Sequence, residues 1–466
     1  QRQMCIRDRT DSVKGRYTMN KGTSEKNRKP LWITLGAAAA CLGIAGGIIA
    51  MNMNSISVTA GAEAVYPKMS QYPKESALTF EQDYDSWWSD RRAQLDQPEG
   101  YADSLWDFYG ESTREFLSTG ENSAYSPVNL YMALAMLADT CDGESRRQIL
   151  DLLGADSIES LRTQAGQVWN ANYCDDGALT SVLANSIWLS EDSAFNGGTL
   201  SGLARNYYAS SFTGKFGTDE MNSAIRDWLN KQTGGFLKDA VGNVAPDAST
   251  VFALYSTVYF KARWDSEFSK SRNTTEIFHA PGGDTKREFM HSTLTYGPYY
   301  YGADFSAVYL NFKTGCGMWL ILPDEDKDID AVLDSGEYLQ MIEAPGEFTG
   351  SGSVQVELAV PKFDVSSTFD LKDGLESMGV TDIFSFERAD FSPICSENLA
   401  VGRANHSVRV QIDEEGCTAA SFVEIAVCGA AMPPEEIVNM TFDRPFMFVI
   451  AGMDGQPLFT GTVCDP

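Results

Sequence analysis

The stretch "EEGCTAASFVEIAVCGAAMPPEE" (Glu414–Glu436) is an extended run of small and apolar residues close to the C-terminus. Two glutamates and a glycine open it, and a pair of prolines lies near its end. Between the glycine and the prolines only Glu424 carries a charge. An apolar segment is normally held by a core, yet this one offers few large side chains that could pack. The rest of the chain has to explain why an acidic protein carries it.

The segments on either side of this stretch are predicted to be strands. "HSVRVQI" (406–412) places its apolar residues and His406 on one face and Ser407, Arg409 and Gln411 on the other. "FMFVIAGMDGQPLFTGTV" (446–463) is typical of two strands joined by an Asp-Gly turn. Upstream, "VQVELAV" (354–360) alternates in the same way, and "VFALYSTVYF" (251–260) is apolar on both faces, as expected of a central strand.

Helices are predicted earlier in the chain. "YSPVNLYMALAML" (125–137) starts with Ser126 as the N-cap and Pro127 at the first helical position. "ESRRQILDLLG" (144–154) predicts a second helix that ends at Gly154. Because helices come first and strands dominate later, the sequence predicts a mixed α+β fold.

Composition limits the function classes. The chain has 466 residues, 43% of them hydrophobic, and a formal net charge of −28, so it can build a large core and repels nucleic acid. Nine cysteines form no CxxC motif and no cluster with histidine, which predicts mostly buried free thiols and no metal site.

The N-terminal hundred residues show four successive patterns. Residues 1–18 form no recognisable element, and we interpret them as non-native or artefactual sequence. The basic segment 19–30 precedes an uncharged run, 31–51, that is long enough to span a bilayer. Basic residues on that side predict a cytoplasmic N-terminus and an extracellular remainder. Residues 31–51 are either a retained signal-anchor or a signal peptide cleaved near Ala60–Ala62, and residues 52–100 are predicted to be a linker.

The sequence predicts no enzyme. It contains only His279, His291 and His406, and it lacks a nucleophile elbow, an HExxH motif and a phosphate-binding loop. His406 falls on the apolar face of its strand, where a buried core histidine is the simpler interpretation. We therefore predict no catalytic residue, no metal and no cofactor.

Several separated motifs, in order, resemble the serpins, a family of serine protease inhibitors that act as suicide substrates. The similarity covers residues 101–466. The motifs that carry it are "NSAYSPVNLYMALAML", "VYFKARWDSEF", "IDEEGCTAAS", "FDRPFMFVI" and "LFTGTVCDP". The resemblance implies three β-sheets with eight or nine helices and an exposed reactive loop near the C-terminus, at about residues 414–440. The stretch Glu414–Glu436 would then contain the peptide bond that a protease attacks.

The resemblance also implies the parts of that loop. Its hinge corresponds to Glu414, Glu415, Gly416, Cys417, Thr418, Ala419, Ala420 and Ser421. The reactive bond follows the hinge glycine by about fourteen residues, which gives Ala430 and Ala431. Residues that control opening of the central sheet correspond to Ser126, Asn129, Ser256, His406 and Trp264. Asn129 and Ser256 differ from the residues that are usual there, as do Cys417 in the hinge and Phe422 after it.

Alternation supports insertion of the loop as a strand. The register that includes Cys417, Ala419 and Ser421 is small or apolar, whereas Glu424 and Phe422 share the opposite face. We expect a monomeric inhibitor of elastase-like or subtilisin-like serine proteases, because alanine at the cut suits a shallow pocket. It would be secreted or tethered outside the plasma membrane through residues 31–51. The alternative is a non-inhibitory member that serves in binding or as a chaperone.

Overall fold

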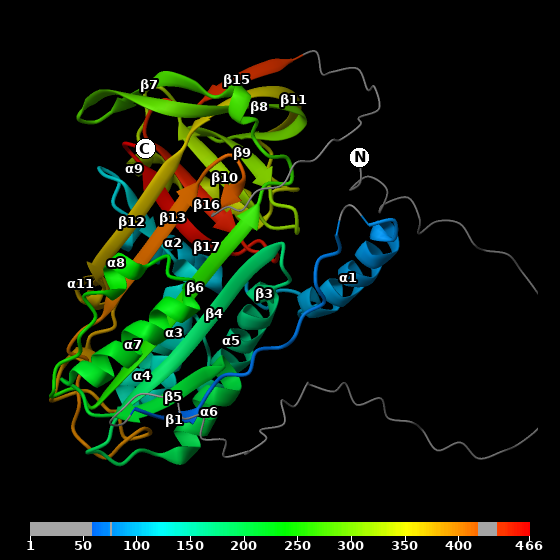
Figure 1. The fold of residues 1–466 in the computed structure, drawn as a ribbon. Coiled ribbons are helices and arrows are strands. Elements are labelled where there is room, and N and C mark those ends of the chain that lie inside the picture. Colours follow the sequence, from blue (N-terminus) through cyan, green and yellow to red (C-terminus); the bar gives the residue numbers. More distant parts are fainter. Residues whose placement is uncertain (1–57, 75–76, 418–435) are drawn as a thin grey trace, which may run out of the picture. The chain divides into compact units, whose positions relative to one another are not determined.

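The computed structural model describes residues 58–74, 77–417 and 436–466. They belong to a compact unit that spans Ser55–Pro466, and Figure 1 shows how their helices and strands are arranged. The α-helices are α1 (Phe80–Leu95), α2 (Leu105–Phe116), α3 (Pro127–Thr140), α4 (Gly143–Leu152), α5 (Ile158–Asn172), α6 (Gly197–Tyr207), α7 (Asp219–Gln232), α8 (Lys238–Val241), α9 (Ile329–Ser335), α10 (Glu337–Glu343) and α11 (Lys372–Ser377).

The main sheet has the strand order β1-β5-β4-β6-β14-β13-β12, and β3 pairs with β4. Its strands are β1 (Thr59–Ala62), β3 (Cys174–Asp175), β4 (Leu179–Ser190), β5 (Ala209–Gly214), β6 (Phe252–Arg263), β12 (Phe363–Asp370), β13 (Asn405–Ile412) and β14 (Gly416–Cys417). All neighbours are antiparallel except β4 and β5. The two long strands β4 and β6 run side by side in the middle of Figure 1.

The remaining strands form two further sheets. One contains β2 (Ser123–Tyr125), β9 (Phe305–Asn311), β10 (Gly317–Pro323), β16 (Phe446–Ala451) and β17 (Pro457–Val463). The other contains β7 (Thr274–Ala280), β8 (Gly283–Tyr301), β11 (Ser351–Pro361) and β15 (Ile437–Thr441). They join where the end of β8 pairs with the start of β9. The predicted α+β fold with three sheets is thus confirmed, with eleven α-helices in the described residues rather than eight or nine.

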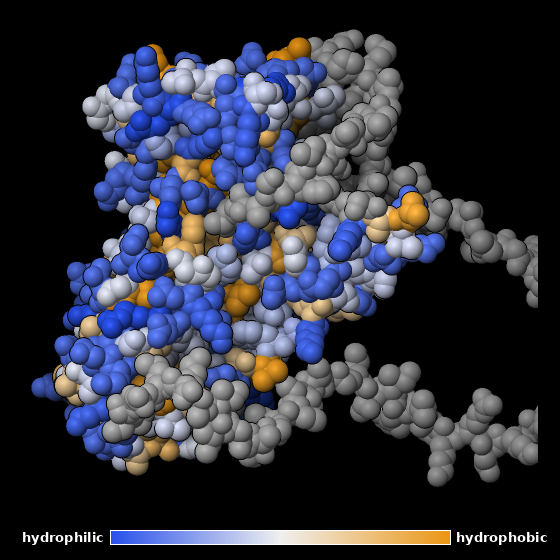
Figure 2. All heavy atoms as spheres, in the orientation of Figure 1, coloured by the Kyte–Doolittle hydropathy of each residue, from blue (hydrophilic) through white to orange (hydrophobic). Residues whose placement is uncertain are grey.

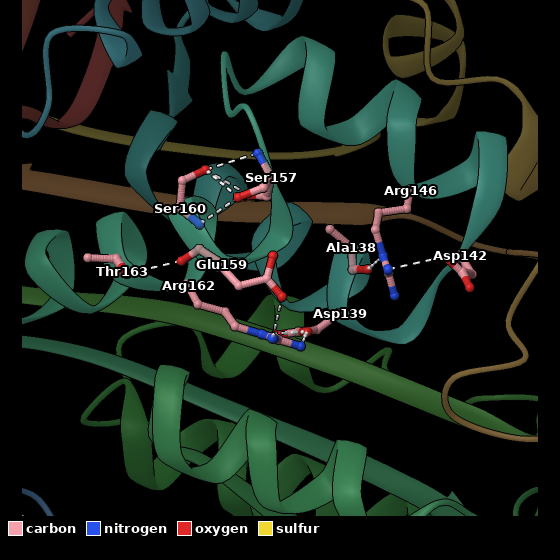
Figure 3. Close-up of polar contacts among 9 residues, drawn as sticks. All are labelled: Ala138, Asp139, Asp142, Arg146, Ser157, Glu159, Ser160, Arg162 and Thr163. Carbon is pink, nitrogen blue, oxygen red and sulfur yellow. Dashed lines mark hydrogen bonds and ion pairs between the residues drawn. The ribbon is translucent and has the colours of Figure 1, made fainter.

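Helix α3 lies inside the molecule and packs against β6 and β17. Ser126 caps it through an N–H···Oγ bond from Asn129, and Pro127 occupies the first position, as the sequence predicts. Its residues are buried nearly all round, which is typical of a core helix. At its far end Asp139 forms a bidentate ion pair with Arg162 of α5, with oxygens 2.9 and 3.1 Å from Nε (Figure 3).

Helix α7 covers the other face of the main sheet (Figure 1). Met221, Ile225 and Trp228 share one side of α7 and pack with Trp188 of β4 and Phe212 of β5 in a second, smaller hydrophobic cluster. Their spacing of three or four residues is that of an amphipathic helix. The main sheet is therefore covered on both faces.

The segment predicted to be a linker, residues 52–100, carries the strand β1 and the helix α1 in its described part. β1 adds to the edge of the main sheet by pairing with β5. Tyr66 stacks on Trp169 of α5, with ring centroids 5.9 Å apart. In α1, Trp87 is 3% exposed and its Nε1 donates to Asp176, while buried Arg91 donates to the carbonyl oxygen of Tyr173. This segment is therefore held against the rest of the unit by a few buried side chains. Its sequence is mostly polar and shows no sustained periodic pattern of apolar residues.

The other N-terminal predictions lie outside the described residues. This holds for the non-native segment 1–18, the basic segment 19–30 and the apolar run 31–51. Among the residues that are described, no helix combines the length and the apolar character that a bilayer span requires.

The docking of α1 can be tested with two adjacent tryptophans. We expect Trp87→Ala to lower the free energy of unfolding by about 3 kcal/mol, because it removes a buried ring and leaves a cavity. Trp88→Ala, at the half-buried neighbouring position, is the matched control and should cost much less. Urea unfolding followed by circular dichroism measures both. Equal effects of the two substitutions would contradict the docking of α1 that we describe.

Candidate functional site

The main sheet is interrupted between β6 and β13. Within the described residues no hydrogen-bonded ladder joins these strands directly, and only the two residues of β14, Gly416 and Cys417, lie between them. Beyond β14 the interruption is a cleft. Its lining residues are Ser126, Asn129, Thr233, Phe236, Leu237, Ser256, Thr257, Val258, Tyr259, Phe260, Ser407, Val408, Arg409, Val410, Cys417, Ile450 and Phe459. We call this cleft the slot.

The walls of the slot are two strand edges. Residues 256–260 of β6 form one wall and residues 407–410 of β13 form the other. Val258 of β6 and Val408 of β13 are buried, whereas Tyr259 and Arg409, the next residue in each strand, are partly exposed. Figure 2 shows apolar residues in the otherwise hydrophilic surface around these two strands. Two strand edges that face one another can accept one further strand between them.

The entry to the slot is shaped by Gly416. Its φ is +151°, which favours glycine, and a Cβ atom there would lie 2.1 Å from the carbonyl oxygen of Ala262. Its N–H and that of Glu415 both donate to Asp413 Oδ1 in a local turn. Gly416 therefore lets the chain turn out of β13 and pass directly against β6. Cys417 follows it, is buried, and pairs with both Ala262 and Ile412.

Ion pairs hold the two hinge glutamates. Glu414 is buried and accepts from Lys362 Nζ at 2.7 Å and from Asn273 Nδ2 at 2.6 Å. Burial raises the pKa of Glu414, but Lys362, the backbone and Asn273 outweigh it, so the pKa lies below its ordinary value. Glu415 accepts from Lys270 Nζ at 2.8 Å. Hydrogen bonds and ion pairs of the two glutamates therefore hold the backbone at the point where the hinge leaves β13.

Trp264 lies beside this entry and is 2% exposed. Its backbone N–H donates to the carbonyl oxygen of Glu415 at 3.1 Å, and its Nε1 donates to that of Asp413 at 2.9 Å. Its ring stacks on Phe312, with centroids 4.6 Å apart. Trp264 therefore fixes the backbone just before the first inserted residues. It directly follows the last residue of β6, whereas the slot residue Ser256 lies near the middle of that strand.

The predicted gate residues Ser126, Asn129, Ser256 and His406 come together at the slot. Ser126, Asn129 and Ser256 all line it. The N–H of Ser126 donates to His406 Nε2 at 3.1 Å, and Ser126 Oγ donates to the carbonyl oxygen of Leu458. Among the described atoms Asn129 Oδ1 is buried without a hydrogen-bond partner. Four of the five predicted gate residues form one cluster, and Trp264 belongs to the entry.

His406 is held as a neutral imidazole. Its Nε2 accepts a hydrogen bond, and its ring lies between Tyr125 and Phe369, 5.4 Å from each ring centroid. Burial lowers its pKa to about 4, because the charged form would lose its hydration without gaining a partner. The ring connects β13 to the start of α3.

The sequence did not indicate which residues bind the hinge glutamates, nor which segment covers the slot. Lys362, Asn273 and Lys270 are distant in sequence, and nothing in their neighbourhood indicates that they meet the hinge. The cover is the turn between α7 and α8, residues 233–237, which lines the slot from outside. The pair of glycines in "KQTGGF" predicts a turn at this position.

Some predicted site residues lie outside the described residues. These are the hinge residues Thr418, Ala419, Ala420 and Ser421 and the reactive-bond residues Ala430 and Ala431. Among the residues that are described, no grouping of three or more histidines, cysteines or carboxylates could hold a metal ion. The six described cysteines are buried free thiols. They are Cys141, Cys174, Cys316, Cys395, Cys417 and Cys464.

Comparison with known proteins identifies relatives over most of the chain. The family model described as "Serpin (serine protease inhibitor)" matches residues 106–466. Alpha-1-antiproteinase 2 of Equus caballus is 29% identical over 361 residues, covering 75% of this chain and 82% of the relative. The thermophilic serpin tengpin in its native state has a TM-score of 0.70 at 26% identity, covering 80% of this chain and 95% of tengpin.

A third comparison concerns a binding protein. The solved complex of thyroxine-binding globulin with thyroxine has a TM-score of 0.65 at 22% identity, with 80% of this chain and 99% of the globulin covered. At that identity the likeness shows a common fold and nothing about a ligand.

Stability should depend on pH through His406. Its folded pKa of about 4 lies below the usual 6.5, so the unfolded chain binds a proton first as the pH falls. The free energy of unfolding should therefore decrease between about pH 6.5 and pH 4, by about 3 kcal/mol from this group. His406→Gln should remove that part of the decrease. Urea unfolding at pH 7 and pH 5 measures it.

The control for this experiment is His279→Gln. The side chain of His279 is 56% exposed, so this substitution removes a histidine without removing a buried ring. A His406→Gln variant with the full pH dependence would show that His406 is not held neutral in the folded protein.

Proposed function

This chain belongs to the serpin family, and we propose that it is a suicide-substrate inhibitor of serine endopeptidases. In this proposal a protease cuts the loop after Ala430, and the freed loop then enters the main sheet between β6 and β13. The acyl-enzyme is trapped before water can hydrolyse it. Members of the family are generally protease inhibitors rather than enzymes.

The observation that carries the proposal is the slot itself. Two strand edges face one another across a cleft, and β14 already occupies the end nearest the hinge. A flexible surface loop would need no such acceptor. Strand addition to a sheet edge is a general mode of peptide recognition, and serpin loop insertion is an established example of it. Here the added strand would pair on both sides.

The register of β14 gives the course of insertion. Cys417 pairs with Ala262 and Ile412 in antiparallel fashion. Continued by two residues, the same register puts Ala419 between Phe260 and Val410, which are both buried. The inserted side chains at 417, 419 and 421 would then point into the core, in agreement with the alternation of small residues in the sequence. Glu424 and Phe422 would point outward.

The chemistry begins with the protease. Its serine attacks the Ala430 carbonyl carbon, the peptide C–N bond breaks, the amine of Ala431 leaves with a proton, and an ester joins Ala430 to the serine. Insertion of roughly 14 residues at about 3.3 Å each moves the ester on the order of 45 Å. This displacement moves the acylated serine away from the other catalytic groups of the protease. The oxyanion of the deacylation step then loses its hydrogen-bond donors, so deacylation fails.

Further parts of the proposal rest on the sequence alone. Alanine at the cut favours elastase-like or subtilisin-like proteases, whose specificity pocket is small. We further propose that the protein is a monomer and that it binds no nucleic acid, because its net charge is negative. It would be secreted, or tethered outside the plasma membrane by residues 31–51. The alternative is a non-inhibitory member that serves in binding or as a chaperone. The small residues at 419 and 421 weigh against it, because charged or bulky residues there would block insertion.

Incubation with an elastase and with subtilisin tests the proposal. We expect a covalent complex that survives denaturing electrophoresis, with mass spectrometry locating the cut between Ala430 and Ala431. The cleaved inhibitor should also melt at a higher temperature than the intact chain, because insertion completes the sheet. Simple cleavage, with neither a complex nor a rise in melting temperature, would refute inhibition by insertion.

The proposed register can be tested with a pair of arginine substitutions. Ala419→Arg would bring a charge between Phe260 and Val410, so insertion should be slowed and the chain should be cleaved as a substrate. Glu424→Arg is the matched control, because Glu424 lies beyond the hinge and the same register puts its side chain on the outer face, so trapping should stay largely intact. The fraction of protease trapped, measured by residual activity, distinguishes the two. Equal trapping by both variants would show the register to be wrong.

A further inference from the structure

We propose that Arg409 is a positioning residue that latches the α7–α8 turn over the slot, and that opening this latch limits the speed of strand insertion. The inference rests on the proposed function and adds to it the residue that holds the cover. It concerns the turn of residues 233–237, Arg409 of β13 and Tyr259 of β6, all of which are described.

Arg409 links β13 to the turn. The carbon of its guanidinium lies 4.7 Å from the centroid of the Phe236 ring, and its Nη1 donates to the Phe236 carbonyl oxygen at 3.3 Å. The guanidinium also forms a two-point ion pair with Asp364 of β12, through Nε at 2.8 Å and Nη2 at 2.6 Å. Asp364 orients the flat group so that its face meets the ring, which a lysine could not reproduce.

The turn rests on the opposite wall through Gly234. Gly234 has a φ of +58°, and a Cβ atom there would lie 2.9 Å from Cζ of Tyr259 in β6. Thr233 is buried, and its Oγ donates to the carbonyl oxygen of Leu229 in the last turn of α7. The turn therefore contacts Tyr259 on one side of the slot and Arg409 on the other. It bridges the cleft from outside and ties its two walls together.

The latch crosses the path of the incoming strand. If the β14 register continued, the third residue after Cys417 would come between Tyr259 and Arg409, on the outer face of the sheet. That residue is Ala420 in the sequence, and Phe422 follows on the same face. An alanine needs little room under the turn, whereas a phenylalanine needs the turn to lift. We infer that the Arg409 contacts to Phe236 break before the strand passes.

Charge keeps the latch closed over the ordinary pH range. Two carboxylates face Arg409, Asp364 on the neighbouring strand and Asp239 in α8. The hydrogen bonds that Arg409 donates to Asp364 are the largest cause that raises the pKa of Arg409, which remains charged. The latch is thus released by movement of the turn and not by loss of a proton.

The test measures uptake of a labelled peptide that copies residues 417–430, followed by fluorescence anisotropy with the full-length protein. Arg409→Ala and Phe236→Leu should each accelerate uptake by roughly 5- to 30-fold, because each removes contacts that must break before entry. The double variant should be no faster than Arg409→Ala alone, since Phe236→Leu removes only the ring contact, which Arg409→Ala has already removed. Arg147→Ala, which removes exposed ion pairs on α4, is the control and should not change the rate.

The outcomes separate the latch from the proposed function. Uptake by the unsubstituted chain with no acceleration in either variant would refute the latch and leave inhibition by insertion in place. Independent, multiplicative effects of Arg409→Ala and Phe236→Leu would also refute it, because a shared contact cannot be lost twice. If Arg409→Ala does not fold, Phe236→Leu against Arg147→Ala decides. An unsubstituted chain that takes up no peptide and gains no stability on cleavage would refute the proposed function, and the latch with it.

Discussion

The separation of β6 from β13, which no ladder of described residues joins directly, is the constraint on which the rest of this structure depends. Facing strands of one sheet normally pair, because a buried peptide group without a partner costs free energy. Here the gap is kept open by its surroundings. β14 separates the two strands at one end, and the α7–α8 turn covers the middle from outside. The proposed activity depends on this incomplete sheet remaining incomplete until a loop is cut.

The floor of the slot explains how the two halves of the sheet are held in place. The start of α3 is bound to β13 through the hydrogen bond between Ser126 and His406, and to β17 through the Leu458 carbonyl oxygen. The far end of α3 is fixed by Asp139 and Arg162. Since α3 also packs against β6, it connects both walls of the slot. A change at Ser126 or His406 would therefore affect the separation of the strands as well as local packing.

The sequence predicted those parts of the fold that have a local signal. The alternation of apolar and polar residues predicted β13, and the Ser-Pro pair predicted the start of α3. Both signals depend only on residues that are close together in the sequence. The sequence contains no local signal for the contacts of residues 58–100, which depend on isolated anchors such as Trp87 and Arg91. It also missed Lys362 and Lys270, because an ion pair between distant segments leaves no pattern in either. The resemblance to the serpins supplied the gate residues, and Asn129 and Ser256 still meet at the slot although both differ from the usual types.

The energetics of the proposed insertion favour small residues in the hinge more than good hydrogen bonds. Each inserted residue would gain about two backbone hydrogen bonds with a net value of roughly 1 kcal/mol each. Ordering its backbone costs about 1–2 kcal/mol, so pairing and ordering nearly cancel. The net drive must then come from the inward side chains, which enter a core already lined by Phe260, Val410 and Val258. There a small apolar residue adds burial without strain, while a charge would reverse the sign of the whole step.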